Sequence, residues 1–271
     1  MKIGVNRWAI PSEWDLPRTF NAVKKAGFDS IELNTADEGE ISLKSTSLDA
    51  QRIRKQAADA GVEISSLLCT ALGPYPMTAN EESTRAKGVQ GLLKHIELGE
   101  ALGVGTLLVV PGGVSSNVQY DQAYYRAQDC IKSTITAAAE ANVVIAIENV
   151  WNKFLLSPLE MKQFIEECAS PNVGCYFDVG NVLVTGFPQH WIRILGKHIA
   201  GVHLKNYHTS IGNIQGFSDN LLHGDVPWAE VRKAFDDIGY NGYVTAELTG
   251  YRAHTELSLK HICETARTIF D

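Results

Sequence analysis

The sequence lacks the cysteine patterns of a disulfide-rich domain or of a small zinc-binding fold. Its 271 residues include five cysteines, an odd number, and no two of them form a CxxC pair. They are Cys69, Cys130, Cys168, Cys175 and Cys263. Reduced thiols in a cytosolic protein fit this pattern better than a disulfide framework or a cysteine-based zinc site.

The sequence also has no long apolar run, and we expect neither a membrane-crossing segment nor a signal peptide. No apolar run approaches the ~20 residues that a spanning helix needs. The N-terminus, MKIGVNRWAI, enters an expected strand directly, without the charged and then apolar stretch of a signal peptide. We therefore expect a cytoplasmic protein that has no membrane partner.

Positive charge is in the minority. The chain has 24 Lys and Arg residues against 31 Asp and Glu residues, which gives a net charge of −7 and a pI near 5.6. A nucleic-acid-binding surface normally needs a basic face. The charge balance therefore argues against nucleic acid as a partner.

Short apolar runs alternate with longer amphipathic segments from one end of the chain to the other. The apolar runs predict strands at residues 2–5, 30–33, 62–68, 106–110, 143–147, 173–177, 199–204 and 243–246. The segments between them predict helices at residues 15–26, 48–60, 80–102, 120–141, after 157, around 190–195, after 227 and at 256–270. Two helix starts have sequence signals: TANE at 78–81 has the form of a capping box, and SPLE at 157–160 places Pro158 at the first helical position.

Eight strand–helix units follow one another without a break in composition that would mark a linker. Continuously apolar strands are typical of a parallel sheet that is covered on both faces. A closed (β/α)8 TIM barrel accommodates eight such units, so we expect residues 1–271 to form a single α/β barrel domain. An open doubly wound sheet is the alternative, but no GxGxxG follows the first strand to support a dinucleotide site.

Four consecutive expected strands end on residues of the kind that bind metals. Glu148, Asp178, His203 and Glu247 stand at or near the ends of the last four strands. A single such residue is often only a helix cap or a hydrogen-bonded core residue. In a barrel, however, the four strand ends meet at one rim, where three buried carboxylates would repel one another unless a cation lay among them. Three oxygen ligands and one imidazole suit Mn²⁺, Mg²⁺, Co²⁺ or Zn²⁺.

The same stretches carry a resemblance to a known family. The series IENVWN, FDVGN, VHLKN and AEL, in this order and at these strand ends, resembles the sugar-phosphate isomerase/epimerase group of xylose isomerase-like barrels. Within the group, the chain looks most like ketose and ketose-phosphate 3-epimerases, including L-ribulose-5-phosphate 3-epimerases. The resemblance implies that Glu148, Asp178, His203 and Glu247 are metal ligands, and that Glu148 and Glu247 are the catalytic acid/base pair. It is also compatible with a homo-oligomer, either a dimer or a tetramer.

This set of residues suits proton transfer next to a ketone. A divalent ion chelated by the carbonyl oxygen and a neighbouring hydroxyl spreads the negative charge of an enediolate. Two glutamates on opposite sides of the sugar then invert one carbon, because one removes a proton and the other returns it from the opposite face. Aldose–ketose isomerisation and the dehydration of sugar acids or inososes use nearly the same groups and stay open as alternatives.

Further residues near the strand ends are candidates for substrate binding by a sugar or a sugar phosphate. They are Trp8, which can stack on a sugar ring, Asn152 and Asn181, which can donate and accept hydrogen bonds, and Lys205 and Arg252, which can meet a phosphate or a hydroxyl. Packing or a solvated surface position is the plain alternative for each of them. Asn181 falls where some ketose epimerases carry a histidine that contacts substrate.

Three other features are less decided. Glu32 is expected at the end of the second strand, where it either binds a hydroxyl or lies at the surface as a cap. The segment 206–225 is long for a loop of this kind and is expected to help cover the pocket. Within it, His223 either contacts substrate or, as the safer interpretation, faces solvent.

Two rivals belong to other functional classes. A nuclease of the AP endonuclease kind would share the barrel, but it needs additional histidines at the third and fourth strand ends, where this chain has LLCTALG and VVPGGV. A non-catalytic sugar-binding barrel would bind metal or sugar without introducing solvent deuterium into the sugar. Both rank below the epimerase interpretation.

Overall fold

Eight parallel strands close on one another in the computed structural model, which describes residues 1–271. The barrel strands are β1 (Lys2–Asn6), β2 (Ser30–Thr35), β3 (Glu63–Cys69), β4 (Thr106–Val109), β5 (Val144–Glu148), β6 (Val173–Asp178), β7 (Ile199–Leu204) and β10 (Tyr243–Ala246). The first strand, β1, pairs with both β2 and the last strand, β10, so the sheet has no edge. The predicted TIM barrel is therefore confirmed, and the open doubly wound sheet is wrong.

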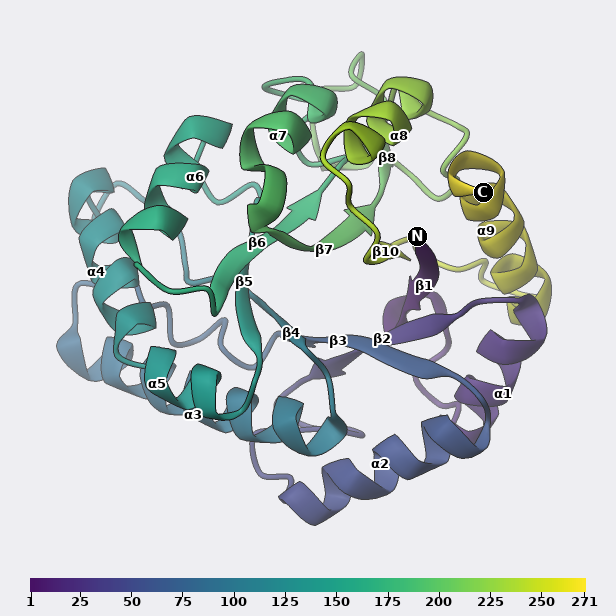
Figure 1. The fold of residues 1–271 in the computed structure, drawn as a ribbon, viewed down its shortest axis with the longest axis horizontal. Coiled ribbons are helices and arrows are strands. Elements are labelled where there is room, and N and C mark those ends of the chain that lie inside the picture. The colour runs from purple at the N-terminus through teal and green to yellow at the C-terminus, as the bar shows by residue number, and fades with distance from the viewer.

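Helices surround the strands as an outer ring (Figure 1). They are α1 (Leu16–Ala26), α2 (Ser47–Asp59), α3 (Glu82–Leu102), α4 (Tyr120–Lys132), α5 (Ile135–Glu140), α6 (Pro158–Glu167), α7 (Pro188–Leu195), α8 (Trp228–Asp237) and α9 (Thr255–Phe270). Three 3-10 turns, η1 (Arg7–Ala9), η2 (Gly196–His198) and η3 (Ile214–Gly216), and a small antiparallel pair, β8 (Asn206–Tyr207) with β9 (Phe217–Ser218), complete the fold. None of the helices combines the length and the apolar character that crossing a bilayer would require.

Of the two helix starts predicted from sequence signals, one is wrong and one is confirmed. The expected capping box at 78–81 does not form, because α3 begins at Glu82 and its cap residue makes no side-chain hydrogen bond. Thr78 instead accepts a hydrogen bond from the backbone N–H of Gly113, at 3.1 Å, and so ties two loops together. The expected start at Ser157 is confirmed: its side chain accepts from the N–H of Glu160, and Pro158 follows in the first turn.

The long helix expected at 120–141 is divided into α4 and α5. Ser133 and Thr134 lie at the break, and their hydroxyls donate to the carbonyls of Cys130 and Ile131, three residues earlier in each case. Such hydroxyls compete with the helical backbone pattern for the same carbonyls. The prediction of one helix rested on the pattern of apolar residues, which contains no information about these hydroxyl hydrogen bonds.

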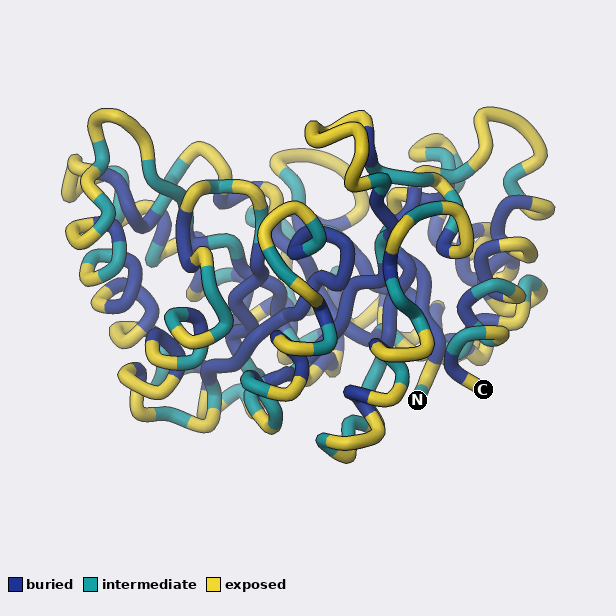
Figure 2. Tube along the Cα trace, turned by 90° about the horizontal axis from the view of Figure 1, so that it is seen from above, coloured by how far each residue is buried: buried dark blue, intermediate teal, exposed yellow.

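The apolar residues form two layers of core. A large cluster of 66 buried residues lies between the strands and the helices. A small cluster of Leu68, Leu108, Ala146 and Tyr176 fills the barrel interior. Gly201 makes room for the Tyr176 ring, because a Cβ at this position would lie 2.6 Å from a ring carbon. Figure 2 shows the result: the buried segments run through the middle of the molecule, and the exposed segments form its outer turns and end loops.

Candidate metal centre and active site

The alternation of side chains along each strand determines which residues face the barrel interior. Successive side chains of a strand point to opposite faces, so residues two apart share a face. Tyr176 points inward, and Asp178, the last residue of β6, therefore does so as well. Ala146 and Glu148 have the same relation on β5. The inward faces of β5 and β6 thus each end on a ligand-type residue at the carboxyl rim.

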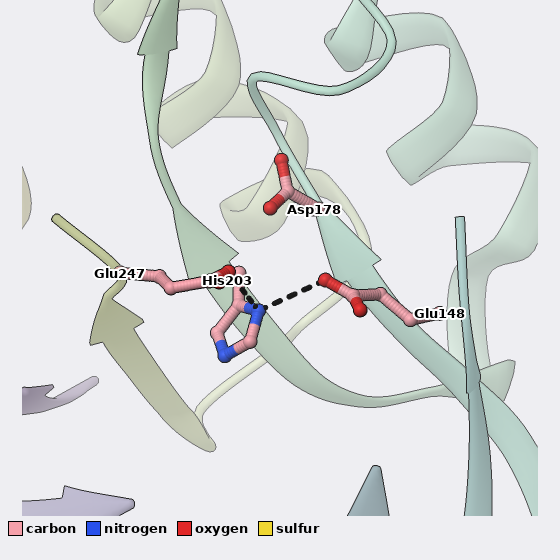
Figure 3. A group of neighbouring side chains, drawn as sticks. All are labelled: Glu148, Asp178, His203 and Glu247. Atoms are coloured by element: carbon pink, nitrogen blue, oxygen red, sulfur yellow. Dashed lines mark hydrogen bonds and ion pairs between the residues drawn. The ribbon is translucent and has the colours of Figure 1, made fainter. Parts of the chain in front are cut away.

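The structure brings the four strand-end residues together. Glu148 ends β5, Asp178 ends β6 and lies in register with His203 of β7, and Glu247 follows β10. The backbone N–H of Glu247 still donates to the Leu204 carbonyl at 3.1 Å, which extends the β7–β10 ladder and holds this glutamate at the rim. One ligand atom from each of the four lies within 4.8 Å of the others, and the side chains converge in Figure 3.

The cluster is buried and rich in negative charge. Asp178 and His203 have no exposed surface, and Glu148 is 7% exposed. His203 Nδ1 lies 3.0 Å from Glu148 Oε1 and 2.7 Å from Glu247 Oε2. Burial of three carboxylates is costly unless positive charge compensates them.

The donor set fits a divalent cation. Asp178 Oδ2 and Glu247 Oε2 are buried oxygens that accept no hydrogen bond of good geometry. They lie 3.1 Å and 2.8 Å from the Lys205 ammonium, so the ammonium balances their charge without satisfying their lone pairs. Carboxylate oxygens of this kind, with an imidazole nitrogen beside them, are the ligands that Mn²⁺, Co²⁺ and Zn²⁺ accept. Glu148, Asp178, His203 and Glu247 are the residues that would hold the ion.

The surroundings change the pKa values of the three carboxyl groups in opposite directions. Burial raises the pKa of Glu148 to about 7, against the attraction of His203, and burial also raises the pKa of Asp178. Burial opposes ionisation of Glu247 too, but the positive charges of His203 and Lys205 outweigh it and lower its pKa to about 2. A bound divalent cation would favour the ionised form of every carboxyl in the cluster.

Glu32 is a residue of the site that sequence reasoning misplaced. Its expected place at a strand end and the surface or capping role are wrong, because β2 continues to Thr35 and Glu32 is completely buried inside the barrel. The expected contact with a substrate hydroxyl stays a prediction. Its Oε1 lies 2.7 Å from Nε2 of His203, on the side of the ring away from the carboxylate cluster. The apolar Leu33 after Glu32 is the signal in the sequence that the strand continues.

A cavity of about 380 Å³ opens beside the cluster. Trp8, Lys205, Phe217 and Glu247 contribute to its lining, together with Ile214, Ser218, Asp219, Leu248 and Thr249. A second cavity, of about 650 Å³, shares Trp8 and Thr249 with the first and contains Arg252. Three of the residues expected to bind substrate, Trp8, Lys205 and Arg252, therefore line these two neighbouring cavities.

The other two residues expected to bind substrate, Asn152 and Asn181, form hydrogen bonds between loops. The Asn181 side-chain amide donates to the Asn149 carbonyl at 2.9 Å, and that of Asn152 donates to the Gly112 carbonyl at 2.7 Å. Neither residue lines the cavity beside Glu247 or the cavity that contains Arg252, and Asn181 lines a separate cavity of about 270 Å³. The placement gives both amides a role in joining neighbouring loops.

The segment 206–225 lies over the cavity, as its length and composition predicted. Its residues Ile214, Phe217, Ser218 and Asp219 line the opening next to Glu247. Asn206 anchors both ends of the segment, because its amide donates to the Leu221 carbonyl and its oxygen accepts from the N–H of Val226. His223 lies against His208, with ring centroids 4.8 Å apart, and does not line the cavity.

Comparison with known proteins places the chain in a family. The model of the xylose isomerase-like TIM barrel family matches residues 20–268. The chain belongs to this family. The resemblance found in the four strand-end motifs is thereby confirmed at the level of the family.

One relative and two solved structures of the same fold illustrate the similarity. The Escherichia coli (strain K12) protein SgbU, provisionally named an L-ribulose-5-phosphate 3-epimerase, is 25% identical over 252 residues, which cover 91% of this chain and 88% of the relative. The structure of an L-ribulose 3-epimerase matches with a TM-score of 0.82 at 19% identity, over 99% of this chain and 94% of that one. The structure of the IOLI protein with a bound zinc atom matches with a TM-score of 0.84 at 18% identity, over 99% and 98%.

Proposed function

We propose that the protein is a divalent-metal-dependent epimerase of a ketose or a ketose phosphate. One observation carries the proposal: two glutamates and two further ligand-type residues converge within 4.8 Å beside a cavity of sugar-sized volume. The names of the relatives, which include L-ribulose-5-phosphate 3-epimerase and L-ribulose 3-epimerase, support the same substrate class.

When bound by these four residues, a divalent ion supplies a positive charge that stabilises negative charge developing on the substrate oxygens. The protein itself supplies the two proton-transfer groups. Glu148 and Glu247 belong to β5 and to the end of β10, which are separated in the barrel by β6 and β7. This separation allows the two carboxylates to approach a bound ketose from different sides.

The proposed reaction needs no redox cofactor. One carboxylate takes the proton from the carbon next to the carbonyl, and the electron pair of the broken C–H bond forms the double bond of an enediolate. The other glutamate then donates a proton to the opposite face of the same carbon, so its configuration is inverted. A base and an acid with different acidities suit these two roles.

Lys205 and the aromatic residues would orient the substrate. The Lys205 ammonium lies at the junction of Glu247 and Asp178, where it can donate to a sugar hydroxyl. Trp8 and Phe217 present apolar ring surface to the same cavity, suited to the C–H face of a sugar. Arg252, in the outer cavity, is placed to meet a hydroxyl or a phosphate at the distal end.

A panel of free and phosphorylated ketoses incubated in D₂O with the Mn²⁺-loaded protein tests the proposal. We expect deuterium at C3 of one ketose pair, together with formation of the C3 epimer. Deuterium at C1 or C2 with an aldose product would show that the protein is an aldose–ketose isomerase and not an epimerase. Binding of sugar with no deuterium in any member of the panel would support the non-catalytic barrel and overturn the proposal.

A further inference from the structure

His203 is held on the side opposite the carboxylate cluster by a second, separate group of buried polar residues. Its Nδ1 faces Glu148 and Glu247, and its Nε2 lies 2.7 Å from Glu32 Oε1. Glu32 has no exposed surface and lies inside the barrel. A buried carboxylate that is not itself placed to bind the ion needs another explanation.

We propose that Glu32 is a positioning residue for the metal centre: its carboxylate accepts the Nε2–H of His203 and thereby reserves Nδ1 for the metal. The inference rests on the proposed function, because it assumes that the cluster binds a divalent ion. Metal-binding histidines usually donate their other ring N–H to a carboxylate or a carbonyl, which sets the tautomer and makes the bound nitrogen a better ligand.

Glu32 is itself held in place on both of its oxygens. The Asn6 amide donates to Oε1 at 2.5 Å, and the Ser66 hydroxyl donates to Oε2 at 2.7 Å. These donors come from the neighbouring strands β1 and β3, so the carboxylate is fixed by the barrel wall on either side of β2. Because both oxygens are engaged, a rotation of Glu32 away from His203 would break two further hydrogen bonds.

The imidazole is also fixed on its face. The Tyr176 ring lies against it with centroids 4.6 Å apart, and the Tyr176 hydroxyl is 3.0 Å from the Ser66 hydroxyl. Ser66 therefore links Tyr176, whose ring is tilted against His203, to Glu32, which accepts the hydrogen bond from the His203 ring. The chain Asn6–Glu32–Ser66–Tyr176 surrounds the ring on the sides that the carboxylate cluster leaves open.

Glu32→Gln tests the proposal with little change in volume. We expect the affinity for Mn²⁺, measured by calorimetric titration of the metal-stripped protein, to fall about 10- to 100-fold. Glu63→Gln is the matched control, because Glu63 lies half-exposed at the other end of the barrel, where it pairs with Lys2. This control should bind Mn²⁺ as the unmodified protein does.

A second readout follows the ring proton directly. In the Zn²⁺-loaded protein, nitrogen NMR of the histidines should show His203 protonated at Nε2 and bound at Nδ1. Ser66→Ala, which leaves Glu32 in the chain, should lower the Mn²⁺ affinity less than Glu32→Gln does and keeps the test available if the glutamine variant fails to fold.

The outcomes separate the two proposals. If the unmodified protein binds no Mn²⁺, the proposed function fails. If it binds Mn²⁺ and folded Glu32→Gln binds it within twofold as tightly, or if His203 is bound through Nε2, the function stands and the role of Glu32 is refuted.

Discussion

Two groups of strands in the barrel interior differ sharply at their carboxyl ends: β3 and β4 form the apolar half, and β5, β6, β7 and β10 form the charged half. On β5, β6, β7 and β10 the inward side chains end in a cluster of charge, Glu148, Asp178, His203 and Glu247. On β3 and β4 the inward positions carry Leu68 and Leu108, which pack with Ala146 and Tyr176. The same alternation of side chains thus builds an apolar wall on one side and a ligand set on the other.

The apolar half affects the electrostatics of the charged half. Leucine side chains offer a carboxylate no hydrogen bond and exclude water, which strengthens electrostatic interactions nearby. Burial is the main reason that the pKa of Glu148 rises to about 7. A site made this way is stable only with compensating positive charge, and this favours a tightly bound cation.

The largest expected effect is a loss of turnover when a glutamate of the charged half is replaced. Glu148→Gln and Glu247→Gln should each lower kcat by at least about 10²- to 10⁴-fold, because each removes a proton-transfer group. Their far-UV circular dichroism should match that of the unmodified protein. Glu63→Gln provides the control for loss of a carboxylate elsewhere, and near-normal turnover in either active-site variant would refute the paired-glutamate mechanism.

The apolar half should respond to substitution in its stability instead. Leu108→Ala removes a side chain that is 2% exposed, and we expect the free energy of unfolding to fall by about 2–5 kcal/mol. Urea denaturation measures this loss. Since Leu108 belongs to the apolar cluster and is not one of the four ligand residues, the Mn²⁺ affinity of the folded variant should change far less than in Glu148→Gln. A comparable loss of affinity would contradict the division of the barrel interior into an apolar and a charged half.

A change of pH should alter the charged half more moderately. The metal-free cluster holds protons at neutral pH, because burial raises the pKa of Glu148 to about 7 and the neighbouring carboxylates, against the effect of burial, raise the pKa of His203 well above its usual value. Both groups must lose these protons to bind metal, so Mn²⁺ affinity should rise with pH through about 7, by about tenfold per unit for each proton released. Titrations at pH 6, 7 and 8 measure the slope, and a flat profile would contradict it.

The smallest effect is expected outside both halves. Arg252 is exposed, and the other arginine of the outer cavity, Arg7, is engaged by Glu40 and by backbone carbonyls. Arg252→Ala should raise KM for a phosphorylated ketose by no more than about fivefold and leave kcat unchanged. Comparison of KM for the free and the phosphorylated form of one ketose measures this effect. An equal rise in KM for both forms would contradict a contact between Arg252 and the phosphate.

The parts of the site that follow from strand periodicity could be predicted from the sequence. Glu148, Asp178 and Glu247 end apolar runs, so their place at the rim followed from the barrel itself. Glu32 did not follow, because the predicted strand stops at residue 33, whereas β2 continues to Thr35 and buries the Glu32 carboxylate inside the barrel. The loop contacts of Asn152 and Asn181 could not be predicted either, because their backbone partners come from other loops, which only the folded chain brings near.

The most direct test of the account is a titration of the metal-stripped protein with Mn²⁺ while epimerisation of a responsive ketose is followed. We predict one ion bound per chain, no turnover before it binds and restored turnover after it binds. Full turnover in a sample verified to be free of metal, or no Mn²⁺ binding at all, would contradict the claim that these four strand ends form a metal-dependent active site.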